Sequence, residues 1–177
     1  AVSIGEIERA RRVGYTGAGE PSDLVYTADI VTENALGQLI EYDVPINAGS
    51  SDMLEQLGRR KRGHRVWLRV NPGFGHGHSH KTNTGGESSK HGIWHEHLDE
   101  ALKHIDQYDL DLVGLHMHIG SGTDFEHLKG VSEAMVEQIL NDGTLRDIEG
   151  APDEHKRVYV TAHDITPEWH MRMQAAF

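Results

Sequence analysis

Residues 110–122 of this chain read Leu110-Asp111-Leu112-Val113-Gly114-Leu115-His116-Met117-His118-Ile119-Gly120-Ser121-Gly122. The apolar residues at the start of this stretch form a run of the length of a buried strand. From Leu115 onward the pattern alternates, which predicts His116 and His118 on one face of the strand and Met117 on the other. We therefore expect a core strand that brings two imidazoles to its carboxyl end.

The small residues Gly120-Ser121-Gly122 predict a tight turn directly after this strand. Thr123 and Glu126 have the spacing of a capping box, which predicts that a helix begins there. A strand, a glycine turn and a helix N-terminus together are typical of a site for an anion, most often a phosphate. The pattern is equally compatible with a helix-capping turn beside a hydrogen-bonded strand histidine.

The rest of the chain alternates between strand and helix patterns. The first helix pattern opens with the capping box Ser3–Glu6 and places Ile4, Ile7, Ala10 and Val13 on its inner face. Strand patterns occupy 24–27, 45–48, 64–70 and 158–161, and further helix patterns lie at 32–40, 50–58 and 98–105. The expected N-caps of the first two of these are Thr32 and either Ser50 or Ser51. Such alternation predicts a parallel sheet with crossover helices, as in a barrel or a doubly wound sheet. The chain has 177 residues, fewer than the roughly 250 of a complete (β/α)₈ barrel. The expected fold class is therefore α/β, a partial (β/α) TIM-type barrel of about five β/α units.

Composition excludes several classes of function. The 17 basic residues are outnumbered by 28 acidic ones, for a formal net charge of −11, which argues against a nucleic acid or an anionic membrane as partner. No apolar run reaches the ~20 residues of a membrane span, and no signal-peptide pattern begins the chain, so we expect a cytoplasmic protein. The absence of cysteine excludes disulfides and thiolate chemistry.

Polar side chains gather where the predicted strands end. In an α/β sheet, ligands bind at the carboxyl ends of the strands, so these residues should converge: Thr27, Asp29, Asn47, Arg69, Asn71, His116 and His118.

A glycine- and histidine-rich loop connects Asn71 to Gly92. Its length of about 20 residues is typical of a functional or mobile segment. His76, His78 and His80 alternate within it, and imidazoles suit Zn, Ni or Cu. A metal-binding module is therefore an alternative function, although alternating residues in a glycine loop do not fix a coordination geometry and favour adventitious binding.

Several phrases of this sequence resemble the diaminopimelate decarboxylases. They include Val2 to Ala10, Ile46 to Ser50, Val70 to His78, Lys81 to Gly86, Ser89 to Gly92 and Leu115 to Gly122. The resemblance covers roughly residues 1–135. It implies a pyridoxal phosphate (PLP) enzyme of lysine biosynthesis, built on an α/β barrel, that removes a carboxylate from the small amino acid meso-diaminopimelate.

The resemblance also implies roles for individual residues. His118 would stack on the pyridine ring, Gly120 and Ser121 would help to hold the phosphate, and Arg69 would lie near the cofactor. The family's PLP-carrying lysine, its triple-glycine loop and its acidic partner for the pyridine nitrogen have no match in this sequence. We therefore expect this fragment to be inactive alone.

The tail resembles a different family. Residues 143–150 and 160–177 are similar to adenosylcobalamin-dependent ribonucleotide reductases, whose chemistry the lack of cysteine excludes. We thus expect a chimera, with a partial PLP-binding barrel over 1–140 and a strand-helix tail over 141–177. A structural hybrid without any ligand is the remaining alternative. Unpaired strands of an incomplete barrel would favour a homo-oligomer or a partly ordered monomer.

Overall fold

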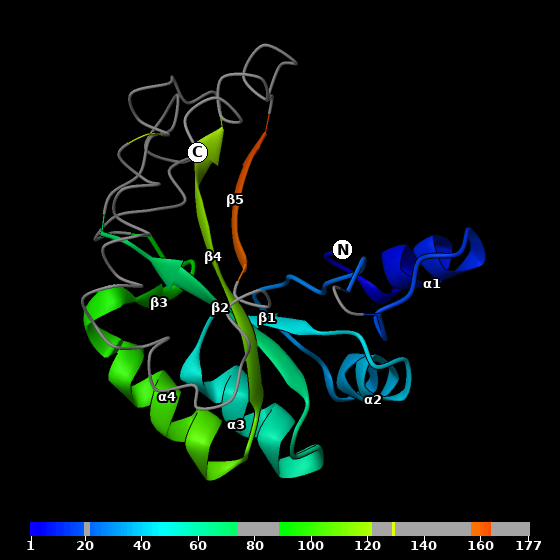
Figure 1. Cartoon of the computed structure of the whole chain (residues 1–177), viewed down its shortest axis with the longest axis horizontal. Helices are drawn as coiled ribbons and strands as arrows, with labels where there is room; N and C mark the ends of the chain where they lie inside the picture. Colours follow the sequence, from blue (N-terminus) through cyan, green and yellow to red (C-terminus); the bar gives the residue numbers. More distant parts are fainter. Residues whose placement is uncertain (20–21, 74–88, 122–128, 130–156, 164–177) are drawn as a thin grey trace.

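The computed structural model of the chain describes residues 1–19, 22–73, 89–121, 129 and 157–163. Its elements alternate in the predicted manner (Figure 1). In chain order they are α1 (Ile4–Arg12), α2 (Glu33–Glu41), β1 (Ile46–Ala48), α3 (Ser51–Arg60), β2 (Arg65–Asn71), β3 (Ile93–Trp94), the 3-10 helix η1 (His95–His97), α4 (Leu98–Gln107), β4 (Asp111–Ser121) and β5 (Arg157–His163).

The strands form one parallel sheet whose spatial order follows the chain, β1-β2-β4-β5. An isolated parallel bridge from Tyr26 to Ile46 adds the 24–27 segment ahead of β1, and the short β3 pairs with the end of β2. A doubly wound sheet reverses its strand order at one point. No reversal occurs among the described strands, which agrees with the predicted partial barrel.

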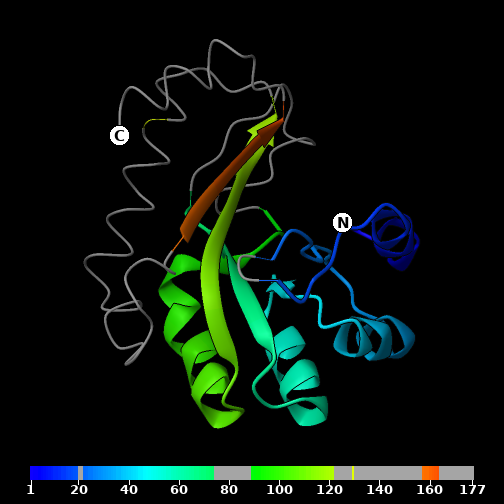
Figure 2. The same cartoon turned by 45° about the vertical axis from the view of Figure 1, so that its right-hand side comes forward.

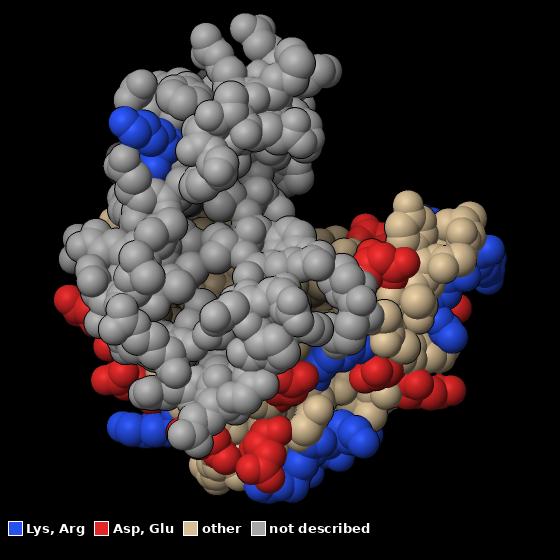
Figure 3. All heavy atoms as spheres, in the orientation of Figure 1, with Lys and Arg blue, Asp and Glu red and all other residues tan. Residues whose placement is uncertain are grey.

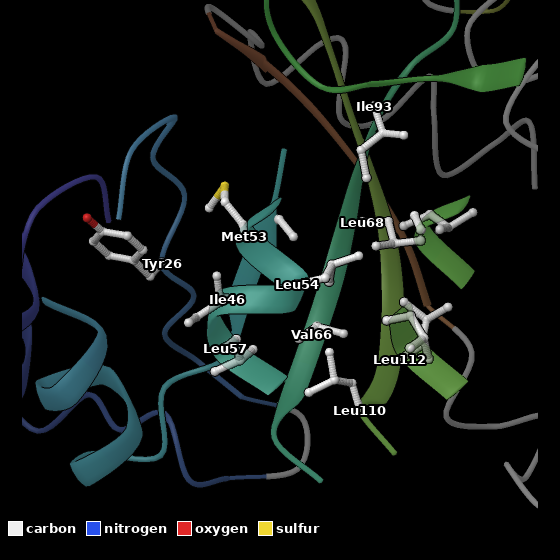
Figure 4. Packing of buried hydrophobic residues seen from close by; sticks show 14 of the residues in the cluster. Tyr26, Ile46, Met53, Leu54, Leu57, Val66, Leu68, Ile93, Leu110 and Leu112 are labelled. Atoms are coloured by element: carbon white, nitrogen blue, oxygen red, sulfur yellow. The ribbon is translucent and has the colours of Figure 1, made fainter. Parts of the chain in front are cut away.

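Helices α3 and α4 lie side by side against the sheet (Figure 2). In Figure 4, Leu54 of α3 points toward β2, and Leu57 lies beside Ile46 of β1. Both of these α3 side chains are buried. Burial of a leucine of this kind contributes about 1.5–3 kcal/mol relative to exposure, so the apolar stripe of α3 fixes the helix on the sheet.

Side-chain caps determine where three helices begin. Ser3, Thr32 and Ser50 each accept a hydrogen bond from the backbone N–H three residues later. Ser3 and Thr32 are the caps expected from the sequence, and Ser50 is one of the two expected candidates, Ser50 and Ser51. Each cap satisfies an otherwise unpaired donor of the first helical turn.

The amino-terminal end of β2 is locked by two polar side chains. Arg65 donates to the carbonyl oxygens of Gly17, Gly19 and Asp43 and also to the Asp43 carboxylate. The neighbouring His64 is 2% exposed, and its Nε2 lies 2.9 Å from the Val44 carbonyl oxygen. Burial lowers the pKa of His64. These contacts tie the loops around α1 and α2 to the sheet, at the end opposite to the carboxyl ends of the strands.

Three local expectations were wrong. The 24–27 strand is reduced to the single bridge at Tyr26. Val13, expected on the inner face of the first helix, is 75% exposed, because α1 ends at Arg12. Gly120 and Ser121, expected in a turn, belong instead to β4, which continues to Ser121 and pairs there with His163 after a register irregularity. Gly122 and the predicted helix start at Thr123 lie outside the described residues.

Candidate functional site

Polar residues from neighbouring strands converge at the carboxyl ends, as predicted. Asn47 Nδ2 donates to Thr27 Oγ1 at 3.3 Å, and Arg69 Nη1 donates to Asp29 Oδ1 at 3.3 Å. In the parallel ladder Arg69 is the register partner of His116. One site is thereby assembled from four successive strand segments.

Arg69 is a largely buried cation in this site. Its side chain is 12% exposed. Desolvation lowers the pKa of the Arg69 guanidinium, and the nearby Asp29 carboxylate opposes this shift. A guanidinium remains charged in any protein environment at neutral pH, so Arg69 supplies a fixed positive charge.

The imidazole of His116 is neutral beside this cation. Its pKa is lowered to about 4, mainly by burial and further by the charges of Arg69 and His118. Met117, between the two histidines, is fully buried in the core, whereas His116 and His118 are half-buried. The predicted alternation of β4 is therefore confirmed, and His116 has the uncharged form that an aromatic ligand can approach without displacing a counter-ion.

The side-chain oxygen of Asn47 is a buried hydrogen-bond acceptor in the same site. Asn47 is 2% exposed, and within the described part of the chain its Oδ1 has no hydrogen-bond partner. Such an atom costs free energy unless a donor reaches it. A polar ligand or a water bound at the carboxyl ends would satisfy it. A cation, the neutral imidazole of His116 and this acceptor together fit an anionic heteroaromatic group such as PLP.

The structure describes only some of the other predicted site residues. Gly120 and Ser121 lie in the last residues of β4, next to β5 in the sheet. His76, His78 and His80 lie outside the described residues. Within the described ranges, no three His, Asp or Glu side chains form a group that could hold a metal ion.

Asp29 and His91 form contacts beside Arg69 that the sequence did not predict. Asp29 was expected at the site but not as the partner of Arg69, and His91 belonged only to the phrase Ser89 to Gly92. His91 Nδ1 lies 2.9 Å from Asp29 Oδ2. The two residues are 62 positions apart in the sequence, so no local pattern could have paired them.

Charge is mixed on the described part of the face that Figure 3 shows. In Figure 3, acidic and basic side chains alternate along the margins of the visible face. Two exposed ion pairs of the described residues are Arg59–Glu55 and Arg62–Asp109. Among the described residues, no helix is both long and apolar enough to cross a membrane.

Comparison with known families agrees with this geometry. Residues 1–143 match the pyridoxal binding domain of the pyridoxal-dependent decarboxylases. The chain therefore belongs to this family, and the cofactor of the family is the predicted PLP.

Proteins of high identity to this chain are diaminopimelate decarboxylases. The chain is 59% identical over 148 residues to the diaminopimelate decarboxylase of Streptomyces coelicolor, which covers 84% of this chain and 33% of the relative. A solved diaminopimelate decarboxylase structure is 58% identical, with a TM-score of 0.75, over 81% of this chain and 34% of that one. The chain thus spans about a third of the length of these relatives.

A more distant structure supports the fold. The diaminopimelate decarboxylase of Helicobacter pylori, complexed with L-lysine, is 23% identical with a TM-score of 0.65 over 78% of this chain and 37% of that one. Small amino acids thus bind to related proteins, and the predicted partial barrel of a PLP-dependent decarboxylase is confirmed. The comparisons do not bear on the resemblance of the tail to ribonucleotide reductases.

Proposed function

We propose that this chain forms part of the cofactor site of a diaminopimelate decarboxylase, which converts meso-diaminopimelate to L-lysine. The observation that carries the proposal is the convergence of Arg69, His116 and His118 at the carboxyl ends of a consecutively ordered parallel sheet. The identity of 59% to a relative of that name supports the same substrate.

In this proposal each residue has a separate task. His118 packs its ring against the pyridine of PLP, and Gly120 and Ser121 hold the phosphate where β4 ends. Arg69 supplies positive charge near the anionic cofactor. PLP itself would supply an electron sink for the carbanion left when carbon dioxide departs. The chain's own residues bind and orient the cofactor.

Binding of PLP to the purified chain tests this function directly. Titration with PLP, followed by the change in its absorbance spectrum, should show saturable binding. Replacement of His118 by alanine should weaken binding about two- to tenfold, because stacking on an aromatic ring contributes roughly 0.5–1.5 kcal/mol. His97→Ala is the matched control, since His97 is exposed on η1. Wild-type chain that does not bind PLP would contradict the proposal.

Turnover is a separate prediction. The sequence has no lysine in the family's PLP-carrying context, so the chain with added PLP and meso-diaminopimelate should release no carbon dioxide. A full-length diaminopimelate decarboxylase serves as the positive control. Release of carbon dioxide in proportion to the chain's concentration would overturn this expectation.

We further propose that the division near residue 140 separates the PLP-binding part from a tail of different origin, and that the chain associates with itself. The family match ends at residue 143, close to that division. β5 pairs with β4 through residues 157–163, so the tail would continue the sheet. Sedimentation velocity of the purified chain over a range of concentrations tests the self-association.

Metal binding by His76, His78 and His80 stays a second, weaker proposal. Alternating imidazoles would give adventitious affinity for Ni²⁺ or Zn²⁺. Calorimetric titration of Zn²⁺ into the chain and into a variant with all three histidines changed to alanine would test it. Unchanged affinity in the variant would move the site elsewhere.

A further inference from the structure

One carboxylate, that of Asp29, contacts two cationic or potentially cationic side chains at the site. Arg69 Nη1 lies 3.3 Å from Asp29 Oδ1, and His91 Nδ1 lies 3.0 Å from the same oxygen and 2.9 Å from Oδ2. The side chains of Arg69 and His91 are 12% and 23% exposed, and that of Asp29 is 45% exposed. The three groups therefore form a network that runs from the interior of the site to its surface.

The backbone fixes His91 in this network. The next residue, Gly92, has φ +81°, and a Cβ built on it would lie 3.0 Å from the Arg69 carbonyl oxygen. Only glycine allows both the positive φ and this close approach. The His91 N–H also donates to Ser89 Oγ at 3.2 Å. The backbone at Gly92 therefore lies directly against β2 at Arg69. This position brings the His91 ring to Asp29.

The chemistry of the carboxylate determines the form of His91. An ionised carboxylate only accepts hydrogen bonds, so Nδ1 of His91 must carry the proton. The neutral ring is then the Nδ1–H tautomer, held by the bond it makes to Asp29. The same bond restrains the Asp29 carboxylate, which is 45% exposed, where it contacts the Arg69 guanidinium.

We propose that Asp29 and His91 are positioning residues for Arg69: His91 orients the Asp29 carboxylate, and Asp29 holds the buried guanidinium in place for the cofactor. This inference rests on the proposed function, because it assumes that Arg69 interacts with bound PLP. It assigns a role to two side chains that act through Arg69 and not by contact with the reacting atoms.

A double-mutant cycle tests the dependence on Arg69. Asp29→Asn keeps the shape of the side chain but removes its charge, and it should weaken PLP binding about tenfold. In the background of Arg69→Gln, the same Asp29→Asn change should have no further effect. His91→Gln should weaken binding less than Asp29→Asn. Asp99→Asn, in the exposed first turn of α4, is the control and should leave the affinity unchanged. Additive effects of the two changes would overturn the proposal.

Nuclear magnetic resonance provides a readout that does not require PLP. At pH 8, the ring ¹⁵N shifts of His91 should show a proton on Nδ1, and they should change in Asp29→Asn. The guanidinium ¹⁵Nη signals of Arg69 should be resolved in the wild type and averaged by rotation in Asp29→Asn. An Nε2–H ring, or averaged Arg69 signals in the wild type, would refute the positioning role. A wild-type chain that shows both signatures but fails to bind PLP would refute the proposed function alone.

Discussion

Two histidines, the buried His64 and the half-buried His116, make the stability of this protein depend on pH. His64 and His116 both have a pKa below the ordinary value of 6.5, with burial as the main cause. Each ring stays neutral in the folded chain while it becomes charged in the unfolded chain. Stability is therefore fully present above about pH 6.5 and is lost as the pH falls from there toward the folded-state pKa.

His64→Gln should reduce this acid sensitivity. Each histidine that stays neutral on folding adds a slope of at most about 1.4 kcal/mol per pH unit below pH 6.5. Urea unfolding at pH 5, 6, 7 and 8 should show a smaller loss of stability in the variant than in the wild type. His97→Gln, which changes an exposed ring on η1, should keep the wild-type slope.

The same measurement can contradict the explanation. If wild-type stability were constant between pH 7 and pH 5, neither His64 nor His116 could be neutral in the folded state while charged in the unfolded one. If His64→Gln and His97→Gln changed the slope equally, burial would not be the cause.

The contact between α3 and α4 depends on a glycine. A Cβ built on Gly58 would lie 2.2 Å from Tyr108 Cγ, so the ring of Tyr108 occupies the space that a side chain would need. Gly37 in α2 is different, since its Cβ would meet only Arg60 Nη2 at 3.8 Å. The two helical glycines therefore have different structural roles.

Alanine at these two positions should give opposite results. Gly58→Ala should lower the free energy of unfolding by about 1–3 kcal/mol, because overpacking displaces Tyr108. Gly37→Ala should raise it by roughly 0.5–1 kcal/mol through helix propensity. Chemical denaturation of both variants checks this, and a stable Gly58→Ala variant would show that α3 and α4 can separate at low cost.

The elements were predictable wherever a local pattern governs them. The caps at Ser3, Thr32 and Ser50 and the alternation around Met117 required only neighbouring residues, and the structure has them. The length of β4 was not predictable, because Ser121 stays in the strand through its pairing with a residue 42 positions later, His163.

At the carboxyl ends of the strands, too, some contacts follow from local sequence patterns and others only from the folded backbone. The convergence of Asn47, Arg69 and His116 follows from their positions at strand ends, and it was predicted. The link from Asp29 to His91 depends on the approach of Gly92 to β2, which only the folded backbone shows.

For the whole molecule, the attachment of the first two helices to the sheet depends strongly on Arg65. Its guanidinium bonds to carbonyl groups of two separate loops, at Gly17, Gly19 and Asp43. Hydrogen bonds from a charged donor that is largely buried contribute roughly 1.5–3 kcal/mol each before mutual dependence is considered. The amino-terminal third of the chain is held to β2 in this way.

Arg65→Met should therefore destabilise the chain by about 2–4 kcal/mol, because several carbonyl groups lose their donor. Arg62→Met is the matched control. Its pair with Asp109 is between side chains that are 57% and 72% exposed, and exposed pairs contribute about 0–1 kcal/mol. Thermal unfolding of both variants checks the difference. Equal destabilisation would show that the Arg65 bonds do not hold the two loops.

The consecutive strand order has a consequence for biosynthesis. Along this path each of the strands β2, β4 and β5 pairs with the strand that precedes it, so none of these three must wait for a partner that is still untranslated. A ribosome that releases the chain at about 5–20 residues per second would allow the sheet to grow one unit at a time. A sheet ordered in this way can gain buried area steadily during its own synthesis.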